Sequence, residues 1–210
     1  MLVVVSVVAG GGDNGTATTT GGGTSPLFEG IPQQNTTLGA ASAPVTLVQF
    51  EDMQCPICRE YQEGGFSAVV DEYVRPGKVK LRFAGLAFLG SDSEKALSYV
   101  LAAGKQNRLW QYADALYANQ GAENSGWVTD GLLERLAGDV GLHWARLQQD
   151  AASSEVQQEA QASAAEAARL QVPGTPSFFV QIGNGQPYHV QPNSFAIDEF
   201  RTILDDALGQ

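Results

Sequence analysis

The chain has 210 residues, 43% of them apolar, and a formal net charge of −11. This length is enough for one domain with a sizeable core. The 23 acidic residues outnumber the 12 basic ones, which argues against a nucleic-acid-binding protein and against electrostatic attachment to anionic lipid, because both partners attract Lys and Arg.

The chain contains two cysteines, Cys55 and Cys58. They can form one disulfide at most, which excludes a small scaffold held together by several disulfides. A structural zinc site needs about four ligands, and His143 and His189 lie far from the cysteines along the sequence. Zinc would therefore need carboxylates or a second chain, and we predict no metal site.

The N-terminal residues differ in composition from the rest of the chain. Residues 2–9 are apolar but too few for a membrane-spanning helix, which needs about 20 such residues. Residues 10–25 contain seven Gly and five Thr, so they cannot bury enough surface to offset their ordering entropy. We predict that residues 1–27 are an apolar stub and a flexible tether of a protein held outside a bacterial membrane. A buried strand at residues 2–9 and a cleaved, secreted form are the alternatives.

The first part of the domain predicts strand, helix and strand. Residues 45–50 (VTLVQF) are rich in β-branched and aromatic side chains and predict a buried strand. Residues 55–74 predict a helix that Gly64 and Gly65 interrupt. Residues 79–86 begin with alternating apolar and polar side chains, which indicates a second strand.

A helical block follows, and no strand pattern interrupts it. Apolar residues at helical spacing predict a series of helices, at 91–103, 109–116, 130–140, 143–150 and 154–170. Ser91 and Glu94 form a capping-box pattern, and Thr129 is the predicted N-cap of a later helix.

The last part of the chain predicts a hairpin and a helix. Residues 177–182 (SFFVQI) predict a strand that pairs with residues 188–191 through a turn at 183–185. Residues 194–208 have apolar side chains on one helical face. Strands divided around helices favour an α/β or α+β sandwich.

The segment Cys55-Pro56-Ile57-Cys58 lies where a predicted strand gives way to a predicted helix. Unpaired N–H groups and the helix dipole stabilise negative charge at a helix start, so we expect a lowered pKa for Cys55. Pro56 suits the first helical position. We predict that Cys55 is the attacking nucleophile and that Cys58, one turn inside and less exposed, is the resolving thiol. Two buried cysteines or a static disulfide are the alternatives.

A second motif, Val172-Pro173-Gly174-Thr175-Pro176, immediately precedes the strand at 177–182. If the Thr175–Pro176 bond is cis, the turn exposes the backbone of Thr175 toward the cysteines. An extended substrate segment can then pair with that edge. By itself, a Thr-Pro pair indicates only a turn.

Together, the two motifs resemble the DsbA-like branch of the thioredoxin superfamily over about residues 30–210. The resemblance implies a thioredoxin fold built from residues 28–90 and 171–210, an inserted helical domain at 91–170, and a cis Pro176. It also implies extracytoplasmic thiol–disulfide exchange on protein substrates, without a soluble cofactor. A quinone-linked membrane partner would reoxidise the site, and Thr175 and Pro176 would shape the substrate-binding edge.

One position departs from this family pattern. Many relatives carry a buried acid six positions before the first cysteine, where this chain has Gln49. Gln49 cannot titrate, but Glu51 shares its strand face and can substitute for the acid. We therefore predict that Gln49, Glu51, Pro56 and Ile57 modulate the redox pair.

The sequence favours an oxidase, which donates disulfides, over a reductase. Pro56 and Ile57 supply no countercharge, and this dipeptide resembles that of secreted disulfide donors. An isomerase usually needs a dimer, and since no dimerisation segment is visible we predict a monomer. A peptide-binding module without turnover is an alternative, whereas Cys58 weighs against a glutathione-dependent transferase. His189 is predicted to be a surface or edge histidine rather than a proton shuttle.

Overall fold

The structure, a computed structural model, describes residues 25–209. A six-stranded sheet with the order β1-β2-β4-β3-β5-β6 forms its centre. The strands are β1 (Gln33–Gln34), β2 (Thr37–Leu38), β3 (Val45–Glu51), β4 (Val79–Gly85), β5 (Ser177–Ile182) and β6 (Tyr188–Val190). β3 pairs in parallel with β4 and antiparallel with β5, and all of its residues are buried.

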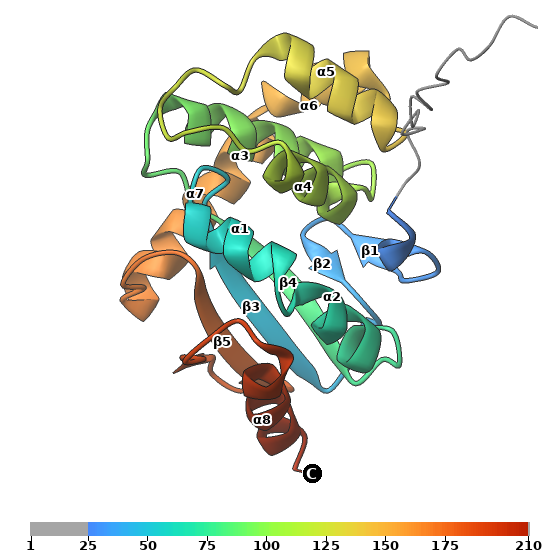
Figure 1. Ribbon diagram of the computed structural model, residues 1–210, viewed down its shortest axis with the longest axis vertical. Coiled ribbons are helices and arrows are strands. Elements are labelled where there is room, and N and C mark those ends of the chain that lie inside the picture. The colour runs from blue at the N-terminus through green and yellow to red at the C-terminus, as the bar shows by residue number, and fades with distance from the viewer. Residues whose placement is uncertain (1–24, 210) are drawn as a thin grey trace, which may run out of the picture.

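Helices cover both faces of this sheet and extend above it (Figure 1). They are α1 (Pro56–Glu63), α2 (Phe66–Val69), α3 (Ser91–Gly104), α4 (Leu109–Ala118), α5 (Asp130–Asp139), α6 (Trp144–Ala151), α7 (Ser154–Leu170) and α8 (Ile197–Leu208). In Figure 1, α1, α2 and α8 lie in front of the sheet, and α3 to α6 gather above it. Ala167 of α7 packs with Val48, Phe50 and Phe179 in a small second core. No helix within residues 25–209 is long and apolar enough to cross a membrane.

The predicted α/β architecture is confirmed, including the helical block between the second predicted strand and the strand that follows Pro176. The predicted interruption at Gly64 and Gly65 separates α1 from α2. A Cβ on Gly65 would lie 2.5 Å from the carbonyl oxygen of Phe195, so this close approach requires glycine. Residues 70–74 continue the helix as a π-helical turn, η2 (Val70–Val74). Thr129 caps α5 as predicted, since its side chain accepts the N–H of Leu132.

The structure differs from the sequence predictions in three places. The capping box at Ser91 is wrong: Gly90, with φ of 117°, precedes α3, and Ser91 is already helical. The short antiparallel pair β1 and β2 was not predicted, because two-residue strands carry no periodic pattern. The last helix begins at Ile197 rather than at residue 194.

The N-terminal prediction falls largely on residues 1–24, which lie outside the described residues. At the end of the predicted tether, Pro26–Phe28 form a single 3₁₀ turn. Phe28 is buried there, with its ring 6.1 Å from that of Phe66. The described fold therefore includes residues 26 and 27, which were assigned to the tether, because Phe28 anchors them to the core.

Gly104 at the end of α3 lets the helix approach the β1–β2 turn. A Cβ there would lie 2.9 Å from the backbone oxygen of Asn35. We expect Gly104→Ala to lower the free energy of unfolding by about 1–3 kcal/mol, measured by urea denaturation. The matched control is Gly138→Ala in α5, where a Cβ meets open space. It is expected to raise the free energy of unfolding by up to about 1 kcal/mol. Equal stabilities of the two variants would contradict the prediction.

Candidate active site

The two cysteines lie at the N-terminal end of α1, immediately after the central strand β3. Cys55 is the N-cap residue and Pro56 occupies the first helical position. Cys58 lies one turn inside the helix. Both are thiols in the structure, and 6% of Cys55 and none of Cys58 is exposed. Cys58 is therefore the deeper of the two, as the sequence predicts.

The pKa values of the two thiols move in opposite directions. The pKa of Cys55 falls to about 6, chiefly because the Cys58 thiol donates a hydrogen bond to it; burial opposes this effect. The backbone N–H groups of Ile57 and Cys58 lower it further, as expected at a helix start. The pKa of Cys58 rises well above its usual range, mainly because the side chain is buried. Near neutral pH, Cys55 is therefore ionised and Cys58 is protonated.

The Thr175–Pro176 turn lies directly beside Cys55. The peptide bond between Thr175 and Pro176 is cis, as the family resemblance implies. When Cys55 is protonated, its thiol donates a hydrogen bond to the carbonyl oxygen of Thr175 at 3.2 Å. The Thr175 hydroxyl has no other partner in the described part of the chain, and as a donor to the Cys55 thiolate it helps to lower the pKa of Cys55.

Gln49 and Glu51 lie beneath the cysteines on β3, and both are buried. Gln49 Nε2 donates to the Tyr61 hydroxyl at 2.7 Å. Glu51 accepts a hydrogen bond from the Tyr117 hydroxyl at 2.8 Å on Oε2, whereas its Oε1 has no partner among the described residues. The structure thus leaves one carboxylate oxygen of Glu51 available.

Glu51 is a buried acid whose pKa depends on Cys55 and whose charge affects the pKa of Cys58. Burial raises its pKa to about 8, although the Tyr117 hydrogen bond lowers it and a charge on Cys55 raises it. Glu51 in turn contributes to the raised pKa of Cys58. At neutral pH, Glu51 is therefore mostly protonated and lies close enough to Cys58 to influence its ionisation.

Asp52 fixes the loop that carries Cys55, and the sequence analysis missed it. Its carboxylate accepts the N–H of Gln54 at 2.9 Å, the Ser93 hydroxyl at 2.5 Å and the N–H groups of residues 88 and 89. No exposed fraction of Asp52 remains. Burial of a charge requires such partners. Apart from Gln54, they lie 36 to 41 residues further along the chain, where no local pattern reveals them.

The helical block supplies further hydrogen bonds to this loop. Gln120 Nε2 donates to the carbonyl oxygens of Met53 and Cys55 at 2.8 and 3.1 Å. The side chain of Gln54 accepts the N–H of Asn124 at 2.7 Å. Residues 53–55 are therefore held from the side of the inserted helices as well as from the sheet.

A groove of about 310 Å³ runs beside the cysteine motif. Ile57, Thr175 and Pro176 line one part of it, and His189 and Phe195 line another. Ile57 is 44% exposed, so it presents an apolar surface at the groove. His189 lies on the edge strand β6, as predicted, and it also lines the groove.

The structure brings all of the predicted site residues into one region. They are Cys55, Cys58, Thr175, Pro176, Pro56, Ile57, Gln49 and Glu51. Pro56 is exposed and contributes through its place at the start of α1. Within the described residues, no three His, Cys, Asp or Glu side chains gather where they could hold a metal ion. The arrangement is suited to chemistry at the Cys55 sulfur.

Comparison with known proteins relates this site to a family. Residues 32–206 match the model of a family described as thioredoxin. A probable disulfide bond formation protein D of Bacillus cereus is 30% identical over 148 residues, which are 69% of this chain and 68% of that protein. Disulfide bond formation protein D of Bacillus subtilis is 32% identical over 102 residues, 48% of this chain and 46% of that protein.

Solved structures show the same fold. Oxidised BdbD from Bacillus subtilis superposes with a TM-score of 0.71 at 24% identity, over 84% of this chain and 94% of that protein. The alpha-DsbA1 protein of Wolbachia pipientis gives a TM-score of 0.70 at 18% identity, over 88% and 96% of the two chains. These similarities confirm the thioredoxin fold and the resemblance to DsbA-like proteins.

The lowered pKa of Cys55 is directly measurable. Ultraviolet absorbance of the thiolate in the reduced protein is expected to titrate with a midpoint near the value of about 6 given by the structure. Cys58→Ala removes the principal hydrogen bond, so the midpoint is expected to rise toward about 8.5. Cys55→Ser serves as the control and is expected to abolish this transition. A midpoint that Cys58→Ala leaves unchanged would contradict the assignment of the hydrogen bond.

Proposed function

The chain belongs to the thioredoxin family and is a DsbA-like thiol–disulfide oxidoreductase, and we propose that it donates disulfides to secreted or envelope proteins through Cys55 and Cys58. The observation that carries the proposal is the opposite movement of the two thiol pKa values at the start of α1. A stabilised Cys55 thiolate favours the reduced form of the pair, and this makes its disulfide a better oxidant.

The proposed reaction begins with the Cys55–Cys58 disulfide. A substrate thiolate attacks the Cys55 sulfur, which forms a mixed disulfide and releases Cys58. A second substrate thiolate then attacks the substrate sulfur of the mixed disulfide and releases Cys55 as a thiolate. The substrate loses two electrons and two thiol protons, and the cysteine pair gains the two electrons. In the reverse direction, Cys58 resolves the mixed disulfide.

Release of Cys58 creates a need for a proton. Cys58 is fully buried and its pKa is raised, so its thiolate is unstable and must be protonated. Glu51 is close to Cys58 and, with a pKa of about 8, carries a proton at neutral pH. We assign Glu51 the role of proton donor to Cys58, in place of an acid at position 49.

The groove beside Cys55 supports a protein substrate. The backbone of Thr175 offers hydrogen-bonding groups to an extended segment, while Ile57 and Phe195 offer apolar contacts. In this proposal, Thr175 and Pro176 position the substrate sulfur and Pro56 and Ile57 adjust the redox pair.

The location and partners follow from the proposed direction of electron flow. A disulfide donor works in an oxidising compartment, so we place the protein outside the cytoplasmic membrane, anchored through its N-terminal segment. A membrane redox partner would restore the Cys55–Cys58 disulfide after each cycle. The protein would act as a monomer, without nucleic acid or a soluble cofactor.

The equilibrium of the cysteine pair with a glutathione redox series tests the direction. We expect a potential near or above about −150 mV, measured by alkylation and mass, as for a disulfide donor. A potential near or below about −250 mV would identify a reductase. A pair that never exchanges would leave a peptide-binding module.

Two cysteine variants control this experiment. Cys58→Ser is expected to retain substrates on Cys55 as mixed disulfides, because the resolving thiol is absent. Cys55→Ser is expected to lose exchange altogether. Full exchange by the Cys55→Ser protein would overturn the assignment of the nucleophile.

The proposed role of Glu51 predicts that the rate of disulfide reduction depends on pH. The rate at which a dithiol substrate reduces the disulfide, corrected for the substrate's own thiolate fraction, is expected to fall with rising pH as Glu51 loses its proton. The fall is expected at or below about pH 8, because the disulfide lacks the Cys55 charge that helps to raise the pKa of Glu51. Glu51→Gln is expected to lower the rate at neutral pH by at least about tenfold and to remove this fall. Stopped-flow kinetics over a range of pH provide the measurement.

Tyr117→Phe separates proton transfer from a structural effect. The Tyr117 hydrogen bond lowers the pKa of Glu51, so its loss is expected to move the fall in rate to higher pH. If the fall in rate at high pH persists unchanged in Glu51→Gln, another group causes it, and Glu51 is excluded as the proton donor.

A further inference from the structure

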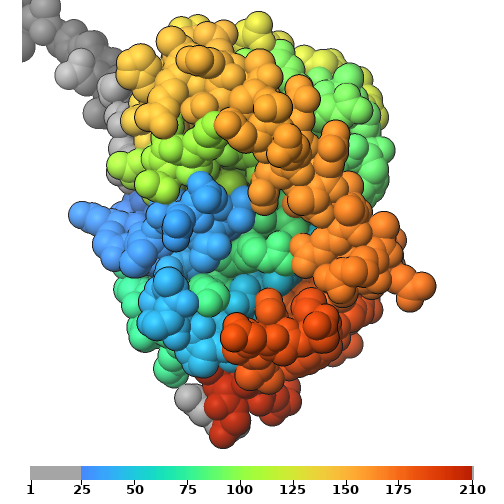
Figure 2. Space-filling view, turned by 180° about the vertical axis from the view of Figure 1, so that it is seen from behind, coloured from blue at the N-terminus to red at the C-terminus, as the bar shows by residue number. Residues whose placement is uncertain are grey.

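A second pocket lies away from the cysteines, where the N-terminal segment meets the start of α4. Its volume is about 530 Å³, and none of its lining residues lines the groove beside Cys55. The lining is mostly polar and comes from residues 25–33 and 107–111. Figure 2 shows the N-terminal segment (blue) against the helical block (lime green) at this junction.

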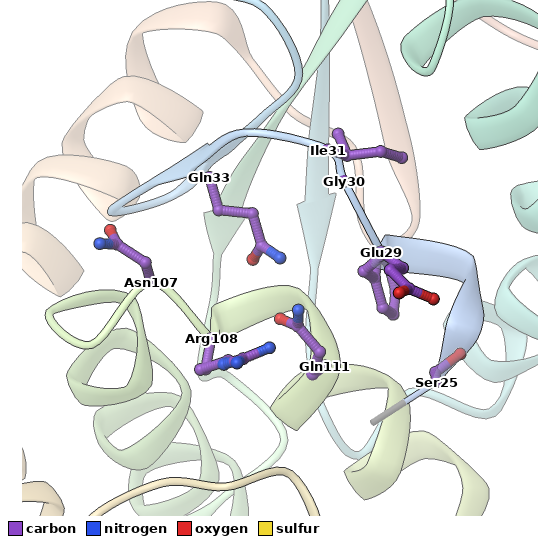
Figure 3. Close-up of a pocket in the computed structure, with 9 residues that line it drawn as sticks. Ser25, Glu29, Gly30, Ile31, Gln33, Asn107, Arg108 and Gln111 are labelled. Atoms are coloured by element: carbon purple, nitrogen blue, oxygen red, sulfur yellow. The ribbon is translucent and has the colours of Figure 1, made fainter. Parts of the chain in front are cut away.

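Two buried amide groups in this pocket lack hydrogen-bond partners. Gln111 on α4 is only 3% exposed, and its Oε1 is unpartnered among the described residues. The Oε1 atom of Gln33, on β1, is also buried and unpartnered there. Figure 3 shows both side chains extending toward the same space from opposite sides. A buried acceptor without a partner is energetically unfavourable, so the pocket favours a ligand with N–H donors.

A cationic side chain also extends into this space. Arg108 is half-buried, and its guanidinium forms no ion pair or side-chain hydrogen bond with any residue in the range 25–209. Figure 3 shows it beside Gln111. A guanidinium presents five N–H donors and no acceptor, and it matches the two oxygens of a carboxylate.

Glu29 adds an opposite charge on another side of the pocket (Figure 3). Its carboxylate is exposed, and it lies in no ion pair within the described part of the chain. The pocket therefore combines one cation, one anion and two amide oxygens. This set is complementary to a ligand that carries both a carboxylate and an amino group.

We propose that this pocket binds a small zwitterion, either a free α-amino acid or the end of a short peptide. The ligand carboxylate pairs with Arg108, and its ammonium or amide N–H groups donate to the oxygens of Gln33 and Gln111. Glu29 balances the ammonium charge. A metal cation fits less well, because Arg108 would place a positive charge beside it.

Isothermal titration of the full-length protein with triglycine tests this proposal. We expect saturable binding, and we expect triglycinamide and N-acetyltriglycine to bind at least about tenfold more weakly, because each lacks one of the two charges. Arg108→Gln is expected to weaken triglycine binding by at least about tenfold. The matched control, Arg146→Gln on the exposed face of α6, is expected to bind like the wild type.

Further titrations distinguish the two sources of the ligand. Binding of glycine as tight as that of triglycine indicates a free amino acid, whereas a clear preference for triglycine indicates a peptide end. Absence of binding of both glycine and triglycine at millimolar concentration would overturn the proposal, as would equal binding of triglycinamide or an unaffected Arg108→Gln variant. Thermal stabilisation by calcium chloride without any response to triglycine would instead identify a cation site. The rate of disulfide exchange tests the proposed function separately from ligand binding, because Arg108 has no part in the proposed reaction.

Discussion

The buried carboxylate of Asp52 holds the active-site loop, and the geometry of both cysteines depends on it. It accepts hydrogen bonds from Gln54, Ser93 and the N–H groups of residues 88 and 89. These bonds join the end of β3 to the start of α3. Since a buried carboxylate that loses its partners is strongly destabilising, the loop has little freedom. Cys55 follows three residues later, so its sulfur is held where the first N–H groups of α1 stabilise a thiolate.

The inserted helices complete this support through hydrogen bonds to residues of the site. Tyr117, near the end of α4, donates to Glu51, and Gln120 donates to the backbone of Cys55. The start of the same helix carries Gln111 in the second pocket. A ligand bound there would change the redox equilibrium only through a difference in its affinity for the oxidised and reduced forms. Because α4 contacts both places, it is the element through which such a difference would act.

The sequence predicted those parts of the molecule that local physics determines. The strands at 45–50 and 177–182 and the helix at 154–170 were found, because a long periodic pattern reports burial on one face. The β1–β2 pair is too short for such a pattern. Cys55 and Cys58 were recognisable because they lie in the same short segment as the helix start that lowers the pKa of Cys55. Asp52 was not, because most of its partners, at residues 88, 89 and 93, lie far along the chain and only the fold brings them together.

The proposed proton transfer depends on the order of the pKa values of Cys55, Glu51 and Cys58 rather than on the pKa of any one of them. That of Cys55 lies near 6, that of Glu51 near 8, and that of Cys58 well above the ordinary value of a thiol. In the proposed reaction, a proton is thus available on Glu51 at neutral pH when Cys58 leaves the disulfide, and its transfer to Cys58 is downhill. Gln49, bonded to Tyr61, fills the other buried polar position without titrating. In this proposal, Glu51 can serve as the proton source two residues beyond Gln49 on β3, provided that burial keeps its pKa between those of the two thiols.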